Sequence, residues 1–115
     1  MNNFWSLDLS HANVPEDFQW EKLKAWPGEP RAFNLTVTQH NGYDDCIYVL
    51  SGRREFEGET QFLKDVWEFT PRTKIWRSRA ALPRCVMAGT GIAIGHSHIF
   101  VLGGADGSLF FKADD

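Results

Sequence analysis

Apolar and polar residues alternate in short runs along most of this chain, and turn-forming residues separate the runs. Residues 47–50 (IYVL) form an apolar, β-rich run that ends at Ser51-Gly52. Residues 66–69 (VWEF) alternate as in a strand with two different faces, and Thr70-Pro71 follows them. A further extended segment begins at residues 74–76 (KIW). Because no helical pattern lies between these runs, they predict a meander of antiparallel strands.

The pattern recurs along the chain, which indicates an internal repeat. Four pairs of segments match in the same order, at separations of about 50 to 60 residues. The matching segments are 4–9 with 66–71, Trp20 with Trp76, Pro30-Arg31 with Pro83-Arg84, and 47–52 with 99–104. A repeat of this length indicates supersecondary units that stack on one another to bury their apolar faces.

Each repeat unit is predicted to contain four strands, which we call A to D in chain order. Strand A is expected at 32–39 and 86–94, strand B at 46–51 and 98–102, strand C at 4–9 and 64–70, and strand D from Trp20 and from Trp76. The chain then divides into C-D over 1–28, A-B-C-D over 29–81 and A-B over 82–115. One complete unit is therefore expected between two half units.

These motifs resemble the kelch repeat, whose units are four-stranded blades of a β-propeller. The Pro-Arg start, the IYVLSG strand, the DVWEFTP strand and the Trp that follows it carry the resemblance. Ser51-Gly52 and Thr70-Pro71 depart from the usual Gly-Gly and Asp-Pro. The predicted fold class is therefore all-β, with about two kelch-type blades that form a partial propeller or a ring completed by oligomerisation.

A closer resemblance is carried by the segments WPGEPR, SGRRE, FLKDVWEFTP and LPRCVMAGTG. They are similar to bacterial sialic-acid mutarotases of the N-acetylneuraminate epimerase family, and especially to its circularly permuted branch. The resemblance implies an isomerase that interconverts the anomers of sialic acid or a similar acidic sugar, without a cofactor. The alternative is a non-catalytic kelch module that binds a partner, since a fold does not determine a function.

Composition narrows the class of protein and its partners. Aromatic residues make up 14% of the 115 residues, which predicts a packed core, and the net charge of −3 without a basic stripe disfavours nucleic-acid binding. No apolar run is long enough for a membrane span, and no signal peptide is visible, so a cytoplasmic location is expected unless a signal segment for the periplasm is missing. Cys46 and Cys85 are expected to be buried free thiols, because a disulfide would require export.

A propeller needs about four to eight blades, so two blades cannot close a ring alone. The two half units are complementary, and chains joined head to tail would complete a blade at each junction. Three copies would give six blades, the number that the mutarotase resemblance implies. The other interpretation is that the chain is a part of a longer propeller.

The D–A and B–C connections of a four-stranded blade emerge on the same face, where candidate binding residues gather. Arg31 and Arg84 follow the two prolines, and a guanidinium suits the carboxylate of an acidic sugar. The alternative is an architectural role, in which each arginine pairs with an acid of a neighbouring blade as part of the repeat. Arg53 and Arg54 on the B–C connection are further candidates, and Trp26 is expected either to stack on a sugar or to pack at the blade corner.

Glu55 and Glu57 are the candidate acid/base residues of the B–C connection. Ring opening at an anomeric centre requires one group to protonate the ring oxygen and another to accept the hydroxyl proton. The simpler interpretation is a solvated charged loop. His96 and His98 at a tight turn do not form a three-ligand set, so no metal site is predicted.

Overall fold

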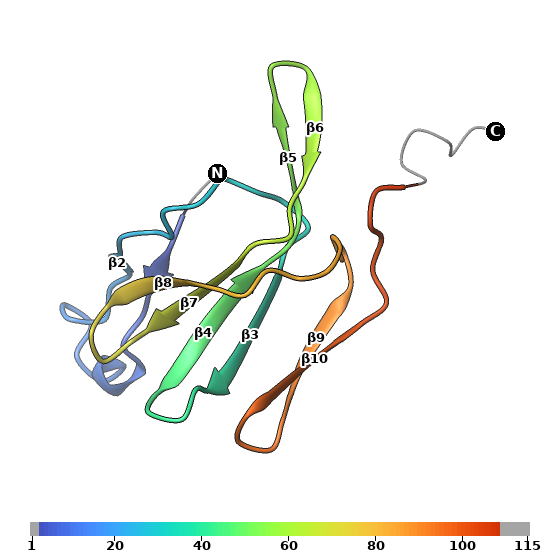
Figure 1. Cartoon of the computed structure of the whole chain (residues 1–115). Coiled ribbons are helices and arrows are strands. Elements are labelled where there is room, and N and C mark those ends of the chain that lie inside the picture. Colours follow the sequence, from blue (N-terminus) through green and yellow to red (C-terminus); the bar gives the residue numbers. More distant parts are fainter. Residues whose placement is uncertain (1–2, 109–115) are drawn as a thin grey trace.

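The computed structural model describes residues 3–108, and its architecture is antiparallel β-sheet throughout (Figure 1). The strands are β1 (Trp5–Ser6), β2 (Glu21–Lys22), β3 (Leu35–His40), β4 (Asp45–Leu50), β5 (Arg53–Phe56), β6 (Glu59–Phe62), β7 (Val66–Thr70), β8 (Ile75–Arg79), β9 (Thr90–Ile94) and β10 (His98–Leu102). One 3-10 helix, η1 (Leu9–His11), lies between β1 and β2. The all-β prediction is confirmed, and no helix in this part of the chain is long and apolar enough to cross a membrane.

The central element is a four-stranded sheet in the order β3-β4-β7-β8. These strands correspond to the predicted strands A to D, and every neighbouring pair is antiparallel. The register places Tyr48 opposite Val37 and Glu68, while Val49 lies opposite Thr36 and Trp67. Because side chains alternate along a strand, these two sets of residues lie on opposite faces of the sheet.

One face of this sheet, the core face, carries the main apolar cluster of the molecule. Its buried members are Leu35, Val37, Cys46, Tyr48 and Leu50. Ala93, Ile99 and Val101 of β9 and β10 pack against this cluster, together with Val66, Leu82 and Val86. Both cysteines are buried and free, as the sequence predicted.

A small residue is needed where β9 approaches the core face. A Cβ placed on Gly91 would lie 3.4 Å from the Leu35 side chain and 3.6 Å from that of Val37. The Gln39 side chain also holds β9–β10 against β3, because its amide nitrogen donates hydrogen bonds to the carbonyls of Ile94 (3.2 Å) and His98 (2.8 Å). Burial and hydrogen bonding together fix β9–β10 against the central sheet.

The opposite face, the aromatic face, meets the N-terminal segment. The Phe4 ring lies edge-on to Phe69 and Trp76, at centroid distances of 4.8 and 5.2 Å. Trp76 also contacts Trp26 at 6.0 Å and donates an indole hydrogen bond of 2.8 Å to the Lys24 carbonyl. These rings secure the chain leading from β1–β2 to the sheet.

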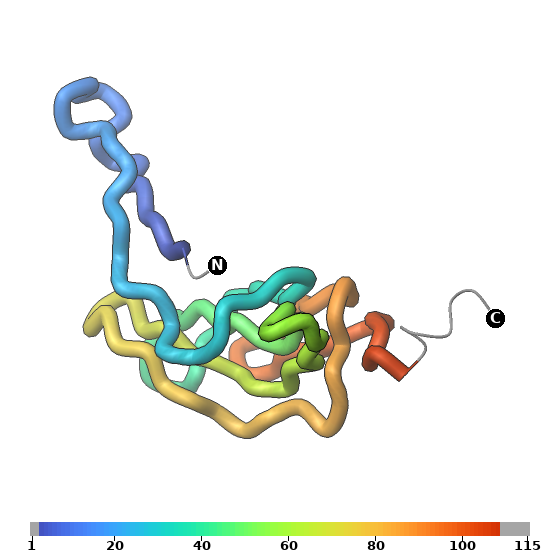
Figure 2. Tube along the Cα trace, turned by 90° about the horizontal axis from the view of Figure 1, so that it is seen from above, coloured from blue at the N-terminus to red at the C-terminus, as the bar shows by residue number. Residues whose placement is uncertain are grey.

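Two-stranded sheets flank the central sheet on both sides, β1–β2 toward the N-terminus and β9–β10 toward the C-terminus (Figures 1 and 2). The far end of the N-terminal segment projects from the body of the molecule (Figure 2). The radius of gyration is 16.3 Å, compared with about 13 Å for a compact domain of about 100 residues. The arrangement is that of open, partly assembled sheets rather than a closed ring.

The structure departs from the sequence prediction at the B–C connection. Residues 53–62 form a hairpin, β5–β6, where a charged loop was expected. The last part of the expected A-B half unit, residues 109–115 with Phe110, lies outside the described residues.

Candidate functional site

The candidate site lies at the end of the central sheet from which hairpin β5–β6 projects (Figure 1). A hollow of about 230 Å³ lies between the connection before β3 and strand β5; it is lined by Pro30, Arg31, Ala32, Arg53, Arg54 and Glu55. A second hollow of about 600 Å³ includes Arg84, Met87, Gly104 and Asp106 among its lining residues. A Cβ at Gly107 would lie 2.7 Å from the Phe62 ring, so hairpin β5–β6 adjoins the second hollow.

Arg31 is buried, and its guanidinium is hydrogen-bonded to protein groups. Its guanidinium makes two parallel hydrogen bonds of 2.7 Å to the Asp65 carboxylate. It also donates to the carbonyls of Ser51 (3.1 Å) and Glu29 (3.1 Å). This geometry is architectural, but the acid differs from the one expected: Asp65 precedes β7 of the same sheet and does not belong to a neighbouring blade.

The Asp65 carboxylate is held in its charged form by this pairing. Burial alone would raise the pKa of Asp65, but hydrogen bonds from Arg31 and from the Trp67 indole (2.7 Å) outweigh it and lower the pKa below its ordinary value. Asp65 thus links the connection before β3 to the start of β7. Sequence reasoning did not select this residue, although it belongs to the quoted DVWEFTP motif.

Arg53 and Arg54 point to opposite sides of hairpin β5–β6, as neighbours on a strand must. Arg54 forms an ion pair with Glu29 and stacks over the Phe56 ring at 4.4 Å. The Arg53 guanidinium lies over the exposed Phe33 ring at 4.8 Å. Both cations line the smaller hollow.

The two candidate acid/base residues differ in position. Glu55 lines the smaller hollow and accepts a hydrogen bond of 2.8 Å from the Thr60 hydroxyl across the hairpin. Glu57 is exposed and forms, with Gly58, the two-residue turn at the hairpin tip. The φ angles of Glu57 and Gly58 are 51° and 80°, the positive values that a two-residue turn between twisted strands requires. Glu55 is therefore better placed than Glu57 to meet a ligand in the hollow.

Trp26 is buried rather than presented to solvent. Its indole nitrogen donates a hydrogen bond of 3.0 Å to the Glu29 carbonyl, and the Arg31 guanidinium lies 5.9 Å from the ring centroid. With the contact to Trp76, these interactions match the alternative in which Trp26 packs at the blade corner.

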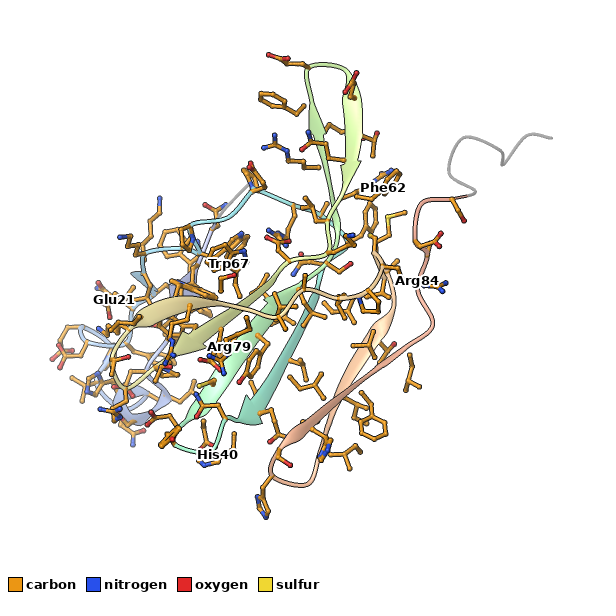
Figure 3. All side chains as sticks on the ribbon, in the orientation of Figure 1. Glu21, His40, Phe62, Trp67, Arg79 and Arg84 are labelled. Atoms are coloured by element: carbon orange, nitrogen blue, oxygen red, sulfur yellow. The ribbon has the colours of Figure 1, made fainter. Side chains whose placement is uncertain are left out.

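Arg84 is the exposed cation of the second hollow. Its side chain is 70% exposed, and its nearest acid is Asp106, at 3.8 Å. Hydrogen bonds from Ser108, with a smaller contribution from Arg84, lower the pKa of Asp106. Arg84 and Phe62 lie toward the hairpin end of the sheet, and His40 lies at the opposite end (Figure 3).

Strand pairing shows that Arg31 and Arg84 do not occupy the same position of the two units. Ala32 bridges to Arg53, and Met87 forms the corresponding bridge to Ala105. Arg31 immediately precedes its bridging residue, whereas Arg84 lies three residues before Met87. Two extra residues, Cys85 and Val86, separate the Pro-Arg pair from strand A in the second unit, and this explains why only Arg31 is buried.

A buried polar group on the core face was not singled out from the sequence. Glu68 is fully buried; its Oε2 accepts a 2.6 Å hydrogen bond from the Tyr48 hydroxyl and lies 3.7 Å from Nε of Arg79. Burial and the adjoining Glu68 carboxylate raise the pKa of Tyr48, which stays protonated. Glu68 Oε1 has no hydrogen-bond partner in the described part of the chain.

The chemistry available in the hollows is recognition of an anion together with proton transfer. Arg53 and Arg84 provide guanidinium groups at the ligand-accessible surface, and Glu55 provides a carboxylate beside one of them. Residues 3–108 contain no group of three or more His, Cys, Asp and Glu side chains arranged to hold a metal ion.

Comparison with known proteins supports the same fold and family resemblance. The chain is 30% identical over 96 residues to the N-acetylneuraminate epimerase of Shigella sonnei (strain Ss046), covering 83% of this chain and 25% of that protein. It is 29% identical, with the same coverage, to the N-acetylneuraminate epimerase of Escherichia coli (strain K12). The chain thus spans about a quarter of the length of these curated relatives. No protein-family model matches it.

Among solved structures, the one described as "Structure of YjhT" superposes with a TM-score of 0.71 at 24% identity, over 96% of this chain and 30% of that chain. YjhT is a kelch propeller, so the open sheets of this chain are those of a partial kelch propeller. The predicted resemblance to the N-acetylneuraminate epimerase family is confirmed.

Proposed function

We propose that this chain, a kelch-propeller segment of the N-acetylneuraminate epimerase type, contributes the binding face of a carbohydrate-active propeller. The proposed reaction is interconversion of the anomers of sialic acid or a similar acidic sugar. The observation that carries the proposal is the pair of hollows beside hairpin β5–β6, which present Arg53 and Arg84 on the face where such a propeller holds its loops.

The sugar carboxylate would be recognised by these two guanidinium groups. Arg84 is largely exposed, and Arg53 lies at the surface over an aromatic ring. Arg31 is not assigned to the sugar, because the Asp65 carboxylate already occupies its guanidinium. Arg54 is likewise held by Glu29.

Anomer interconversion requires two proton transfers and no net change of atoms. One group protonates the ring oxygen while another accepts the proton of the anomeric hydroxyl, the bond between ring oxygen and anomeric carbon breaks, and the open-chain carbonyl form recloses on its other face. Glu55 is assigned one of these transfers, since it lies in the same hollow as Arg53. The second group is expected from the blades that complete the ring.

The test is NMR of freshly released sialic acid, in which the protein should accelerate equilibration of the anomers. Arg84→Ala and Arg53→Ala should each reduce the rate at low substrate by about tenfold or more, the effect of losing a charge-assisted hydrogen bond of about 1.5–3 kcal/mol. Glu55→Gln should lower the rate at saturating substrate.

Lys74→Asn is the matched control, because Lys74 lies in the β7–β8 turn at the other end of the sheet and asparagine tolerates its φ of 58°. Equal loss in Lys74→Asn and Arg84→Ala would reject the site. Carboxylate-dependent binding without any acceleration by a ring-closed assembly would favour the non-catalytic binding module instead.

A further inference from the structure

Strands β10 and β1 correspond to β4 and β7 of the central sheet. Within residues 3–108, each of them lacks one of the two neighbouring strands that β4 and β7 have. Strand β4 pairs with β3 on one side and β7 on the other, whereas β10 pairs only with β9 within residues 3–108. Strand β7 pairs with β4 and β8, whereas β1 pairs only with β2 in the described part of the chain. Half of a blade therefore lies at each end of the molecule, and an unpaired edge is a template for strand addition.

Large apolar side chains are exposed on β9–β10 where the central sheet buries their counterparts. Phe100 and Leu102 are 51% and 56% exposed, and Ile92 of β9 lies opposite Phe100 on the same face. The corresponding residues of the central sheet are Tyr48 and Leu50, which β9–β10 itself covers. The exposed face of β9–β10 thus has the composition of a blade face that a further blade covers.

We propose that a second copy of this chain completes the C-terminal half blade. Its β1–β2 hairpin adds to the free edge of β10, and the aromatic face of its central sheet covers Ile92, Phe100 and Leu102. Strands β3 and β4 of that copy carry Thr36, Thr38 and Ile47 on the aromatic face. Both threonines are exposed in the single chain. Both surfaces of the junction are therefore present on one chain, and residues 3–108 leave them exposed.

The register of the junction follows from the pairing of β4 with β7. That pairing sets Tyr48 opposite Glu68 and Val49 opposite Trp67. The same pattern sets Phe100 opposite Ser6 of the second copy and Val101 opposite its Trp5. The β1–β2 register supports the equivalence, because Trp5 lies opposite Lys22 as Trp67 lies opposite Ser78.

This register brings the exposed tryptophans of one copy to the cations of the other. Trp5 and Trp20 are 48% and 64% exposed in the single chain. At the junction their rings would cover the core face of β7 and β8, where Arg77 and Arg79 are exposed. Guanidinium groups stack favourably on indole rings. Glu68, whose Oε1 lacks a partner within residues 3–108, lies on the same face.

The charges at the junction are also compatible. In the central sheet, Asp65 precedes β7 and pairs with the buried Arg31. The equivalent positions at the junction are Asn3, before β1, and Val86, before the bridging residue Met87. A neutral pair thus replaces the ion pair on both sides, so neither half blade buries a lone charge at this position.

When every junction forms in this way, each chain contributes two blades to the assembly, its central sheet and two half blades. Propellers close with about four to eight blades, so a closed ring would contain two to four copies. A closed ring leaves no free edge, whereas an open head-to-tail series would continue to grow.

Two measurements test the junction, and neither depends on catalytic activity, so they are independent of the proposed function. Light scattering of the wild-type chain should give an integer multiple of 13.1 kDa, between two and four. In the double variant Ser6→Cys with Phe100→Cys, mild oxidation should produce covalent multimers, because directly opposite residues bring their Cβ atoms within disulfide range.

The matched control is Ser6→Cys with Ile92→Cys. Ile92 is exposed on the same face as Phe100 but lies one strand farther from the edge, so this pair should yield at least tenfold less crosslinked product. A folded monomer in light scattering would overturn the proposal and assign both surfaces to other parts of a longer polypeptide. Equal crosslinking of the two variants would also overturn it.

Discussion

Asp65 and Glu68 lie close together in the sequence of β7 and its approach, but the fold uses them differently. Asp65 is partly exposed and accepts hydrogen bonds from Arg31 and Trp67. Glu68 is fully buried on the core face with Tyr48 and Arg79. Paired and hydrogen-bonded charges are retained in such positions because removing one partner leaves the other uncompensated. At the residue scale, Asp65 therefore holds the connection before β3 against the start of β7 at the candidate site.

Asp65→Asn should destabilise the fold strongly, because the Arg31 guanidinium would remain buried without its counter-charge. The expected loss in free energy of unfolding is about 2–4 kcal/mol at pH 7, measured by urea denaturation. Glu29→Gln is the control, since Glu29 is exposed and its ion pair with Arg54 should be worth less than about 1 kcal/mol. A similar loss in both variants would contradict the structural role of Asp65.

The stabilisation that Asp65→Asn removes should also depend on pH. The pKa of Asp65 is lower in the folded chain than in the unfolded chain, so its contribution is complete above the unfolded value of about 3.9 and is lost as the pH falls through the folded value. The difference in unfolding free energy between the wild type and Asp65→Asn should therefore shrink below about pH 4. A difference that stays constant down to pH 2 would show that the charge of Asp65 is not what stabilises the fold.

At the scale of elements, hairpin β5–β6 gives the candidate site its shape. Its base is fixed by hydrogen bonds from the Leu63 amide to the Gly52 carbonyl (2.8 Å) and from the Ser51 amide to the Asp65 carbonyl (3.1 Å). Arg53, Arg54 and Glu55 therefore stand on a paired strand rather than on a loop. Side chains on paired strands are held more precisely than side chains on loops.

Variants at the turn of this hairpin distinguish a structural role of Glu57 from a catalytic one. Glu57→Asn should stabilise the hairpin by several tenths of a kcal/mol, because asparagine adopts a φ of 51° more readily than glutamate does. Glu57→Val should destabilise it by about 1 kcal/mol or more, since a β-branched residue is strained there. Amide hydrogen exchange of β5 and β6 measures both effects. Loss of anomer equilibration in Glu57→Asn with an intact hairpin would instead identify Glu57 as a catalytic residue.

The sequence predicted the elements that depend on periodicity and missed those that depend on a local turn. Residues 47–50 are continuously apolar because both faces of their sheet are covered, whereas residues 66–69 are interrupted by Glu68 on the core face; they form strands β4 and β7 as expected. Hairpin β5–β6 was missed because its residues are mostly charged, and its turn, Glu57-Gly58, is not the common Asn-Gly pair.

The candidate site was predictable as a face but not as a set of free side chains. The D–A and B–C connections meet at the same end of the sheet as expected. Whether an arginine there is free depends on contacts between distant residues, such as Arg31 with Asp65, 34 positions apart. The two extra residues before Met87 likewise separated Arg84 from the position of Arg31, and only strand pairing reveals this difference.

At the scale of the whole molecule, the tryptophans distinguish the interior of one chain from the junction between chains. Trp26 is buried within the chain, among Trp76 and Arg31. Trp20 and Trp5 are exposed together at the N-terminal half blade, where they line an apolar hollow. An exposed apolar patch on a soluble protein marks an interaction site, and here the proposed partner is the core face of another copy.

Trp20→Ala and Trp26→Ala should consequently affect different properties, the assembly and the stability of the single chain. Trp26→Ala should lower the free energy of unfolding by about 3–5 kcal/mol, because it leaves a cavity beside Trp76. Trp20→Ala should shift the mass measured by light scattering toward that of one chain, while an isolated chain changes its unfolding free energy by less than about 0.5 kcal/mol. Fluorescence reports the same junction, since dilution of the wild type should move the emission to longer wavelength as Trp5 and Trp20 become exposed. If Trp20→Ala retains the full assembly mass, the junction does not use the N-terminal half blade, and the free edge of β10 must be closed by a different segment.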